Sequence, residues 1–352
     1  MPNGILRGMN GCASQNPLRN AAYIGDSRED AHGLPVFTRL AEALAGGYSH
    51  LSIGPGVYHE KLTVSHDDVV LCGEDPGNTI ITFDDAHGTL GVDGKPLGTG
   101  GSATVTISGA RFTAHGITFA NGFDYLAHAR HHTDDPARLS GLQAVALRTV
   151  EGSDCAHFTN CHFTGYQDTL FINSGRHYFK DCTVTGNIDF IFGAGTAVFE
   201  DCAIISRDRQ DAVENGFIVA PSTKGYQPFG MLFLHCRLER ELLCMAAHSV
   251  WLGRPWHPAG DPEAVPSACF LSCTMDDHIR KEGWTSMHSR TKEGLCATWY
   301  PWQSRFYESD TQGPGGAQAS ATRTILSPED ASRWNRDTML APWNVLMDQS
   351  TQ

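Results

Sequence analysis

The sequence predicts an all-β protein, a right-handed parallel β-helix with short capping helices at its ends. A Phe-x-x-Cys pattern recurs along the middle of the chain, and its first two intervals are 21 and 20 residues, a period typical of a solenoid. Short segments rich in β-branched residues flank each copy, so the repeating unit is built from strands. The 37 glycines suit the many tight turns of such a fold. The pattern begins at Phe158, Phe179, Phe199, Phe233 and Phe270.

The elements follow in chain order. Residues 36–44 carry apolar residues at helical spacing, which predicts a helix that caps the first coil. Strands are expected at 69–72, 79–82, 103–107, 116–119, 162–164, 183–185 and 203–205. The later repeat intervals, 34 and 37 residues, indicate loop insertions after Cys202 and Cys236, and such loops often carry function. Near the end, Ser327 is expected to cap a short helix with Pro328 at its first position.

These elements predict one solenoid from about residue 50 to about residue 310. We expect residues 1–30 to form an N-terminal extension and residues 31–352 a single domain with a C-terminal helical segment. A two-domain α/β protein is the alternative. It would need several amphipathic helices between the strands, and the sequence does not show them.

Composition narrows the range of partners. The formal net charge is −13, which disfavours nucleic acid because its binding needs clustered Lys and Arg. There is no run of about 18 apolar residues, so no membrane span is expected. The eleven cysteines form no Cys-x-x-Cys pair and His-Glu-x-x-His is absent, so neither a metal nor another cofactor is expected. We expect a monomer.

Two aspartates occupy the same phase of the repeat. Asp168 lies seven residues after Cys161, and Asp189 lies seven residues after Cys182. Equivalent positions of neighbouring coils lie about 4.8 Å apart, so the two carboxyl groups should face each other. Like charges that close titrate in two steps, which leaves one acid and one carboxylate.

The spacing alone does not name a reaction. An aspartate in a glycine-rich turn often does no more than bind its own backbone. A carboxylate pair about 5 Å apart is also the arrangement of retaining glycosidases.

Three longer stretches resemble the signature sequences of pectin methylesterases, carbohydrate esterase family 8, bacterial type. They are Gly-Tyr-Gln-Asp-Thr-Leu-Phe at 165–171, Gly-Asn-Ile-Asp-Phe-Ile-Phe-Gly at 186–193 and Trp-Leu-Gly-Arg-Pro-Trp at 251–256. Weaker matches occur at 56–60, 102–105, 143–148 and 305–308, and the resemblance covers roughly residues 50 to 317. It implies the pectin lyase-like solenoid and the hydrolysis of methyl esters of polygalacturonate to pectate and methanol.

The resemblance also implies roles for individual residues. Asp189 matches the nucleophile, and Asp168 matches the group that protonates methanol and then activates water. Gln143 and Gln167 match donors to the oxyanion, and Arg254 matches the partner that keeps the nucleophile ionised. Without the resemblance, the two glutamines could equally form a ladder inside the solenoid, and the arginine could be a surface charge.

Substrate-lining positions are implied in the same way. Trp256 matches an aromatic platform for the sugar ring, although a core tryptophan is the plain alternative. Phe171 stands where Tyr is frequent in the family, so a hydroxyl contact to the substrate is expected to be missing. The complete set expected from the resemblance is Trp256, Phe192, Met287, Thr99 and Phe171.

The pair Cys182 and Cys202 matches a disulfide found in some bacterial relatives, and a ladder of buried free thiols is the alternative. The resemblance implies a protein that is secreted or held in the periplasm or cell envelope, although the sequence shows no signal peptide. Its partner would be methyl-esterified homogalacturonan, that is, pectin.

Two other functions are the alternatives. A polysaccharide lyase or hydrolase on the same fold would need a Ca²⁺-binding carboxylate cluster or a denser aspartate triad. A repurposed envelope-associated relative without pectin activity would be expected to have lost part of the set of five catalytic residues named above, which is intact here.

Overall fold

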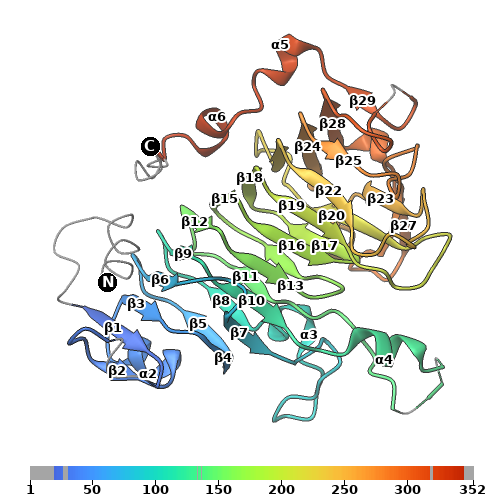
Figure 1. Cartoon of the computed structure of the whole chain (residues 1–352). Helices are drawn as coiled ribbons and strands as arrows, with labels where there is room; N and C mark the ends of the chain where they lie inside the picture. The colour runs from blue at the N-terminus through green and yellow to red at the C-terminus, as the bar shows by residue number, and fades with distance from the viewer. Residues whose placement is uncertain (1–19, 27–30, 133, 136, 318–319, 345–352) are drawn as a thin grey trace.

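The computed structural model describes residues 20–26, 31–132, 134–135, 137–317 and 320–344. It is a parallel β-helix in which successive strands fall in turn into three stacked sheets (Figure 1). One coil, for example, consists of β12, β13 and β14, and the next of β15, β16 and β17. The predicted fold class is therefore confirmed, and the two-domain α/β alternative is wrong.

The strands of each sheet are hydrogen-bonded in spatial order. Sheet A contains β2 (Val36–Phe37), β1 (Ala21–Ile24), β3 (His50–Ile53), β6 (Val70–Gly73), β9 (Thr113–His115), β12 (Ala156–Thr159), β15 (Arg176–Lys180), β18 (Thr196–Glu200), β21 (Met231–Leu234), β24 (Ser267–Leu271), β28 (Arg305–Ser309) and β29 (Thr324–Ile325). Sheet B contains β25 (Thr274–Met275), β22 (Arg237–Arg240), β19 (Ala203–Ser206), β16 (Thr183–Gly186), β13 (His162–Thr164), β10 (Thr118–Asn121), β7 (Thr79–Phe83) and β4 (Gly56–His59). Sheet C contains β23 (Val250–Gly253), β20 (Gly216–Pro221), β17 (Ile188–Gly193), β14 (Leu170–Ile172), β11 (Leu147–Thr149), β8 (Val105–Ile107) and β5 (Leu62–Val64).

The remaining elements are short. A hairpin of β26 (Met287–Arg290) and β27 (Cys296–Trp299) stands apart from the three sheets. The helices are α2 (Leu40–Ala45), α3 (Gly98–Gly101), α4 (Tyr125–Arg130), α5 (Pro328–Ala331) and α6 (Arg336–Leu340), with 3₁₀ turns η1 (Pro258–Gly260) and η2 (Pro301–Gln303).

The phenylalanine of the repeat explains why the coils stack. Each one lies in a sheet A strand and points into the core, opposite the phenylalanine of the next coil. Successive ring centroids are 4.5 to 4.8 Å apart with nearly parallel planes, which matches the spacing of parallel strands. The stacked rings are Phe158, Phe179, Phe199, Phe233 and Phe270.

The cysteine of the repeat forms a second ladder. Cys182 and Cys202 are buried free thiols, so the structure shows the thiol ladder rather than the disulfide. The thiol of Cys182 lies 3.5 Å from the carbonyl oxygen of Phe158, and that of Cys202 lies 3.5 Å from the carbonyl oxygen of Phe179. Each thiol thus donates to the backbone of the preceding coil.

Two expectations need adjustment. Residues 36–37 form β2 rather than the start of a helix, because they pair with Tyr23 and Ile24, and α2 begins only at Leu40. The sheets also reach beyond the expected range of residues 50 to 310, from β1 to β29. Neither end of the solenoid carries the Phe-x-x-Cys pattern, so the repeat could not reveal these coils. The cap at Ser327 is confirmed, since its side chain accepts a hydrogen bond from the backbone N–H of Asp330.

The connections from sheet B to sheet C hold most of the long insertions. Residues 84–104 contain α3 and residues 122–146 contain α4, while 207–215 and 241–249 are the loops expected after Cys202 and Cys236. In the two coils between these pairs the connections are short, the turn at 165–169 and the single residue Asn187. The insertions therefore flank the coils that carry the two aspartates.

Candidate active site

The two aspartates lie on neighbouring coils in the same register. β14 and β17 pair with Leu170 opposite Ile191 and Phe171 opposite Phe192, a constant offset of 21 residues that also relates Asp168 to Asp189. Both residues are buried, with 8% and 7% of their surface exposed. Both also adopt a left-handed backbone, with φ of 66° and 49°, a conformation that aspartate tolerates better than most residues.

Arg254 forms an ion pair with Asp189. Its Nε donates to Oδ1 at 2.8 Å and its Nη2 donates to Oδ2 at 2.6 Å, a bidentate pair. The guanidinium also lies 3.8 Å above the centre of the Phe217 ring. Burial lowers the pKa of Arg254, but the charge and hydrogen bonds of Asp189, together with the charges of Glu214 and Asp168, raise that pKa overall, so the guanidinium stays charged. Asp189 is thus paired with a permanent cation and oriented by it.

Asp168 has the opposite environment. Burial raises its pKa well above the ordinary value, and the neighbouring charge of Asp189 raises it further, against a smaller lowering by Arg254. Asp168 therefore tends to stay protonated, while Asp189 is paired with the guanidinium of Arg254. Catalysis by an acid and a nucleophile needs such a pair, with one protonated carboxyl group and one carboxylate.

Gln143 and Gln167 lie beside the pair on adjacent coils. The backbone N–H of Ala144 donates to the carbonyl oxygen of Gln167 at 3.0 Å, which holds the two segments together. Both glutamines are partly exposed, so they do not form a ladder inside the core. The side-chain oxygen of Gln143 is buried and finds no hydrogen-bond partner among the described residues.

Three aromatic residues form a cluster on the outer face of sheet C. The rings of Phe171 and Phe192 stack with centroids 4.2 Å apart. Trp256 meets both edge-on, at 6.1 and 5.6 Å. Trp256 is only partly buried, and it packs against this small cluster rather than the main core of the solenoid.

The two remaining candidates, Thr99 and Met287, are not members of this cluster. Thr99 lies in α3, and its Oγ1 is 3.1 Å from Nδ1 of His87. Met287 begins β26, whose hairpin packs against η1, the turn that starts two residues after Trp256. No described interaction joins either residue to the aromatic cluster or to the carboxylate pair.

Two supporting residues were not predicted. Phe217, which lies under Arg254, pairs in register with Ile188, and only the structure reveals this pairing. Asn187 is 1% exposed, its Oδ1 accepts from the N–H of Ile188 at 2.7 Å, and its Nδ2 has no partner within the described part of the chain. Asn187 lies inside the second signature stretch, so its position in that motif was an available signal.

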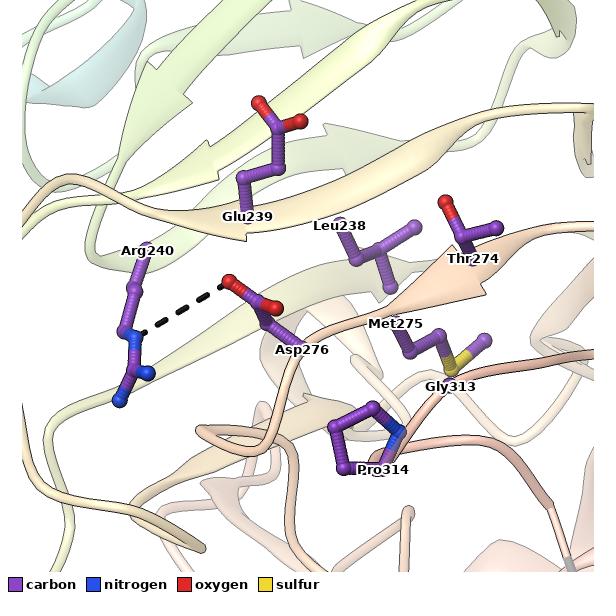
Figure 2. Close-up of a pocket in the computed structure, with 8 residues that line it drawn as sticks. All are labelled: Leu238, Glu239, Arg240, Thr274, Met275, Asp276, Gly313 and Pro314. Carbon is purple, nitrogen blue, oxygen red and sulfur yellow. Dashed lines mark ion pairs between the residues drawn. The ribbon is translucent and has the colours of Figure 1, made fainter. Parts of the chain in front are cut away.

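A cavity of about 310 Å³ lies elsewhere, on sheet B near the C-terminal end of the solenoid. Figure 2 shows that β22 and β25 line it and that Arg240 and Asp276 form an ion pair at its side, 3.9 Å apart. Arg240 also pairs with Asp277 at 2.8 Å, so its charge is neutralised within the protein. None of the predicted site residues lines this cavity.

Two further kinds of site are absent from the described residues. No three His, Cys, Asp or Glu side chains among them are grouped as a metal ion would require. Likewise, none of the helices described here is long and apolar enough to cross a membrane.

Comparison with known proteins gives consistent matches. Residues 46–339 match the Pectinesterase family. Pectinesterase A of Dickeya dadantii is 36% identical over 324 residues, 88% of either chain. Among solved structures, a pectin methylesterase from Erwinia chrysanthemi has a TM-score of 0.87 at 34% identity, over 94% of this chain and 99% of that one. The enzyme from Yersinia enterocolitica has a TM-score of 0.84 at 38% identity, over 88% and 100%.

Proposed function

This chain belongs to the pectinesterase family, and we propose that it hydrolyses the methyl esters of polygalacturonate with Asp189 as the nucleophile and Asp168 as the acid and base. Its activity is that of a pectin methylesterase. The observation that carries the residue assignment is the bidentate pairing of Asp189 with Arg254 beside a second buried carboxyl group.

In the first step, a carboxylate oxygen of Asp189 attacks the carbonyl carbon of the ester. Arg254 orients that carboxylate through two hydrogen bonds and places a positive charge beside it. The side-chain N–H groups of Gln143 and Gln167 donate hydrogen bonds to the carbonyl oxygen and stabilise the negative charge that develops on it. Asp168 enters this step protonated and gives its proton to the departing methanol, which leaves an acyl group on Asp189.

In the second step, the ionised Asp168 takes a proton from water, and the hydroxide attacks the acyl carbon. The bond to Asp189 breaks, galacturonic acid is released and loses its proton to the solvent, and both aspartates return to their starting states. The sugar ring rests on Trp256, with Phe192, Phe171, Thr99 and Met287 around it. The described carboxylates supply the acid, base and nucleophile, so the proposed mechanism requires no metal ion.

We further propose that residues 31–352 act as one catalytic domain and as a monomer. The substrate is methyl-esterified homogalacturonan, a polymer found in cell walls, so we propose that the enzyme works outside the cytoplasm, as a secreted or cell-envelope protein.

The direct test is the substitution Asp189→Ala, measured as methanol release from highly methylated pectin. We expect kcat to fall by about 10³-fold or more, because the covalent step is lost. Asp181→Ala is a matched control, since Asp181 has the same left-handed backbone, with φ of 53°, but is exposed.

Methanol release that survives Asp189→Ala would reject the nucleophile. A fall in the viscosity of the pectin solution without methanol release would instead indicate a lyase or a polysaccharide hydrolase.

A further inference from the structure

Arg148 lies on the outer face of sheet C, in the same row as the aromatic cluster. On β11, Leu147 and Thr149 are buried, whereas Arg148 is partly exposed on the opposite face. Arg148 is in register with Phe171 of the next strand, which is in register with Phe192 of β17. β11 and β17 are two strand spacings apart, about 10 Å. The arginine therefore lies beside the proposed sugar-binding surface, with Phe171 between it and Phe192 in the same row.

The guanidinium of Arg148 lacks a hydrogen-bond acceptor within the described part of the chain. Its Nε is buried without a partner, and its one described interaction is with the Phe171 ring, 6.0 Å away. Burial lowers the pKa of Arg148, and no neighbouring carboxylate counteracts that effect. This isolation is notable in a chain with 39 acidic and 26 basic residues, because a half-buried arginine normally has an anionic partner.

The backbone of α3 leaves room for this side chain. A Cβ atom added at Gly100 would lie 2.3 Å from Nη1 of Arg148, so only glycine fits there without displacing the guanidinium. Thr99, a candidate substrate-lining residue, directly precedes Gly100. The guanidinium thus lies between α3 and Phe171. Thr99 in α3 and Phe171 are both candidate substrate-lining residues.

We propose that Arg148 binds the free carboxylate of a de-esterified galacturonate unit adjacent to the ester under attack. The inference rests on the proposed function, since it concerns the same substrate. A planar guanidinium binds a carboxylate through two parallel hydrogen bonds, an interaction that a methyl ester cannot match. Each turnover converts a neutral unit into an anionic one, so a partly processed polymer offers such carboxylates next to remaining esters. Arg148 then makes the enzyme prefer esters that have a free acid as neighbour, despite the acidic character of the whole chain.

The test compares two substrates, fully methyl-esterified and half-esterified polygalacturonate, with the wild-type chain and with Arg148→Gln. We expect the KM for the half-esterified polymer, divided by the KM for the fully esterified one, to rise at least five-fold in Arg148→Gln. Arg148→Lys should retain part of the preference because it keeps the charge but not the fork of donors. Arg333→Gln is the control, an exposed arginine beyond α5.

Gly100→Ala provides a second route, because the added methyl group displaces the guanidinium without removing it. We expect the same direction of change in the KM ratio, with kcat altered less than KM. An unchanged ratio in either folded variant would overturn the role of Arg148 while leaving methanol release intact. A wild-type chain that releases no methanol from either polymer would overturn the proposed function, and the role of Arg148 with it.

Discussion

At the scale of single residues, the site depends on two aspartates in unequal surroundings. Arg254 offers Asp189 two hydrogen bonds and a full charge, whereas burial and the neighbouring carboxylate raise the pKa of Asp168. Asp168 therefore lowers the stability of the folded protein whenever the pH exceeds the ordinary pKa of an aspartate. An unfolded chain would ionise this residue freely, while the folded chain resists doing so.

This asymmetry predicts the effect of Asp168→Asn on stability. A raised folded pKa gives a contribution that is complete below the unfolded pKa, near 3.8, and is lost as the pH rises through the folded value. We expect Asp168→Asn to raise the free energy of unfolding at pH 7, by roughly 1.4 kcal/mol for each unit of the pKa shift. The gain should shrink as the pH approaches 4. Denaturant unfolding at several pH values measures it, and a variant that is less stable at pH 7 would contradict the proposed protonation state.

Counting along the repeat was enough to pair Asp168 with Asp189, because equal phase in a solenoid means adjacency in space. It could not assign Phe217 to Arg254 or show that Arg148 lacks a hydrogen-bond acceptor among the residues that the structure describes. Those relationships depend on side-chain directions and on the lengths of the insertions, which vary from coil to coil.

At the scale of elements, each Phe-x-x-Cys unit forms a corner of the solenoid. The phenylalanine stacks on its neighbours, and the cysteine lies where the chain enters sheet B and donates to the coil before it. The sequence predicts these strands well because the same residue types recur at every corner. It did not predict β1 and β2, nor α3 and α4, because the end coils lack the corner residues and the insertions lack any repeat.

The free thiols lead to a prediction about reducing agents. Because Cys182 and Cys202 are unlinked, dithiothreitol should leave the melting temperature unchanged within about 1 °C. A native disulfide would instead contribute about 2–5 kcal/mol and its reduction would lower the melting temperature. A drop of several degrees with dithiothreitol that is absent in Cys202→Ala would show that the pair is linked.

At the scale of the whole molecule, a C-terminal strap, residues 326–344, returns along the outside of sheet A (Figure 1). Its apolar side chains cover an outward-facing row on successive sheet A strands. Arg176 on β15 fastens it by donating to the carbonyl oxygens of Leu340 and Ala341, both at 2.9 Å. The covered row consists of Tyr178, Val198, Leu232, Cys269 and Tyr307.

The strap should stabilise the solenoid without affecting catalysis, since it lies on sheet A and the site lies on sheet C. Leu340 is fully buried, so Leu340→Ala should lower the free energy of unfolding by about 2–5 kcal/mol. Leu295→Ala is the control, because Leu295 is 67% exposed. Denaturant unfolding and methanol release measure the two properties. A loss below about 1 kcal/mol, or a large fall in kcat, would contradict this role.

The position of the strap in the chain also bears on how the protein is made. A ribosome synthesises every coil before residues 326–344, so the coils can stack one after another as they emerge. The nascent solenoid nevertheless exposes the row from Tyr178 to Tyr307 until the last segment is translated. During that interval the uncovered strip is an apolar surface that molecular chaperones can recognise, and a chain truncated before residue 326 would keep it exposed permanently.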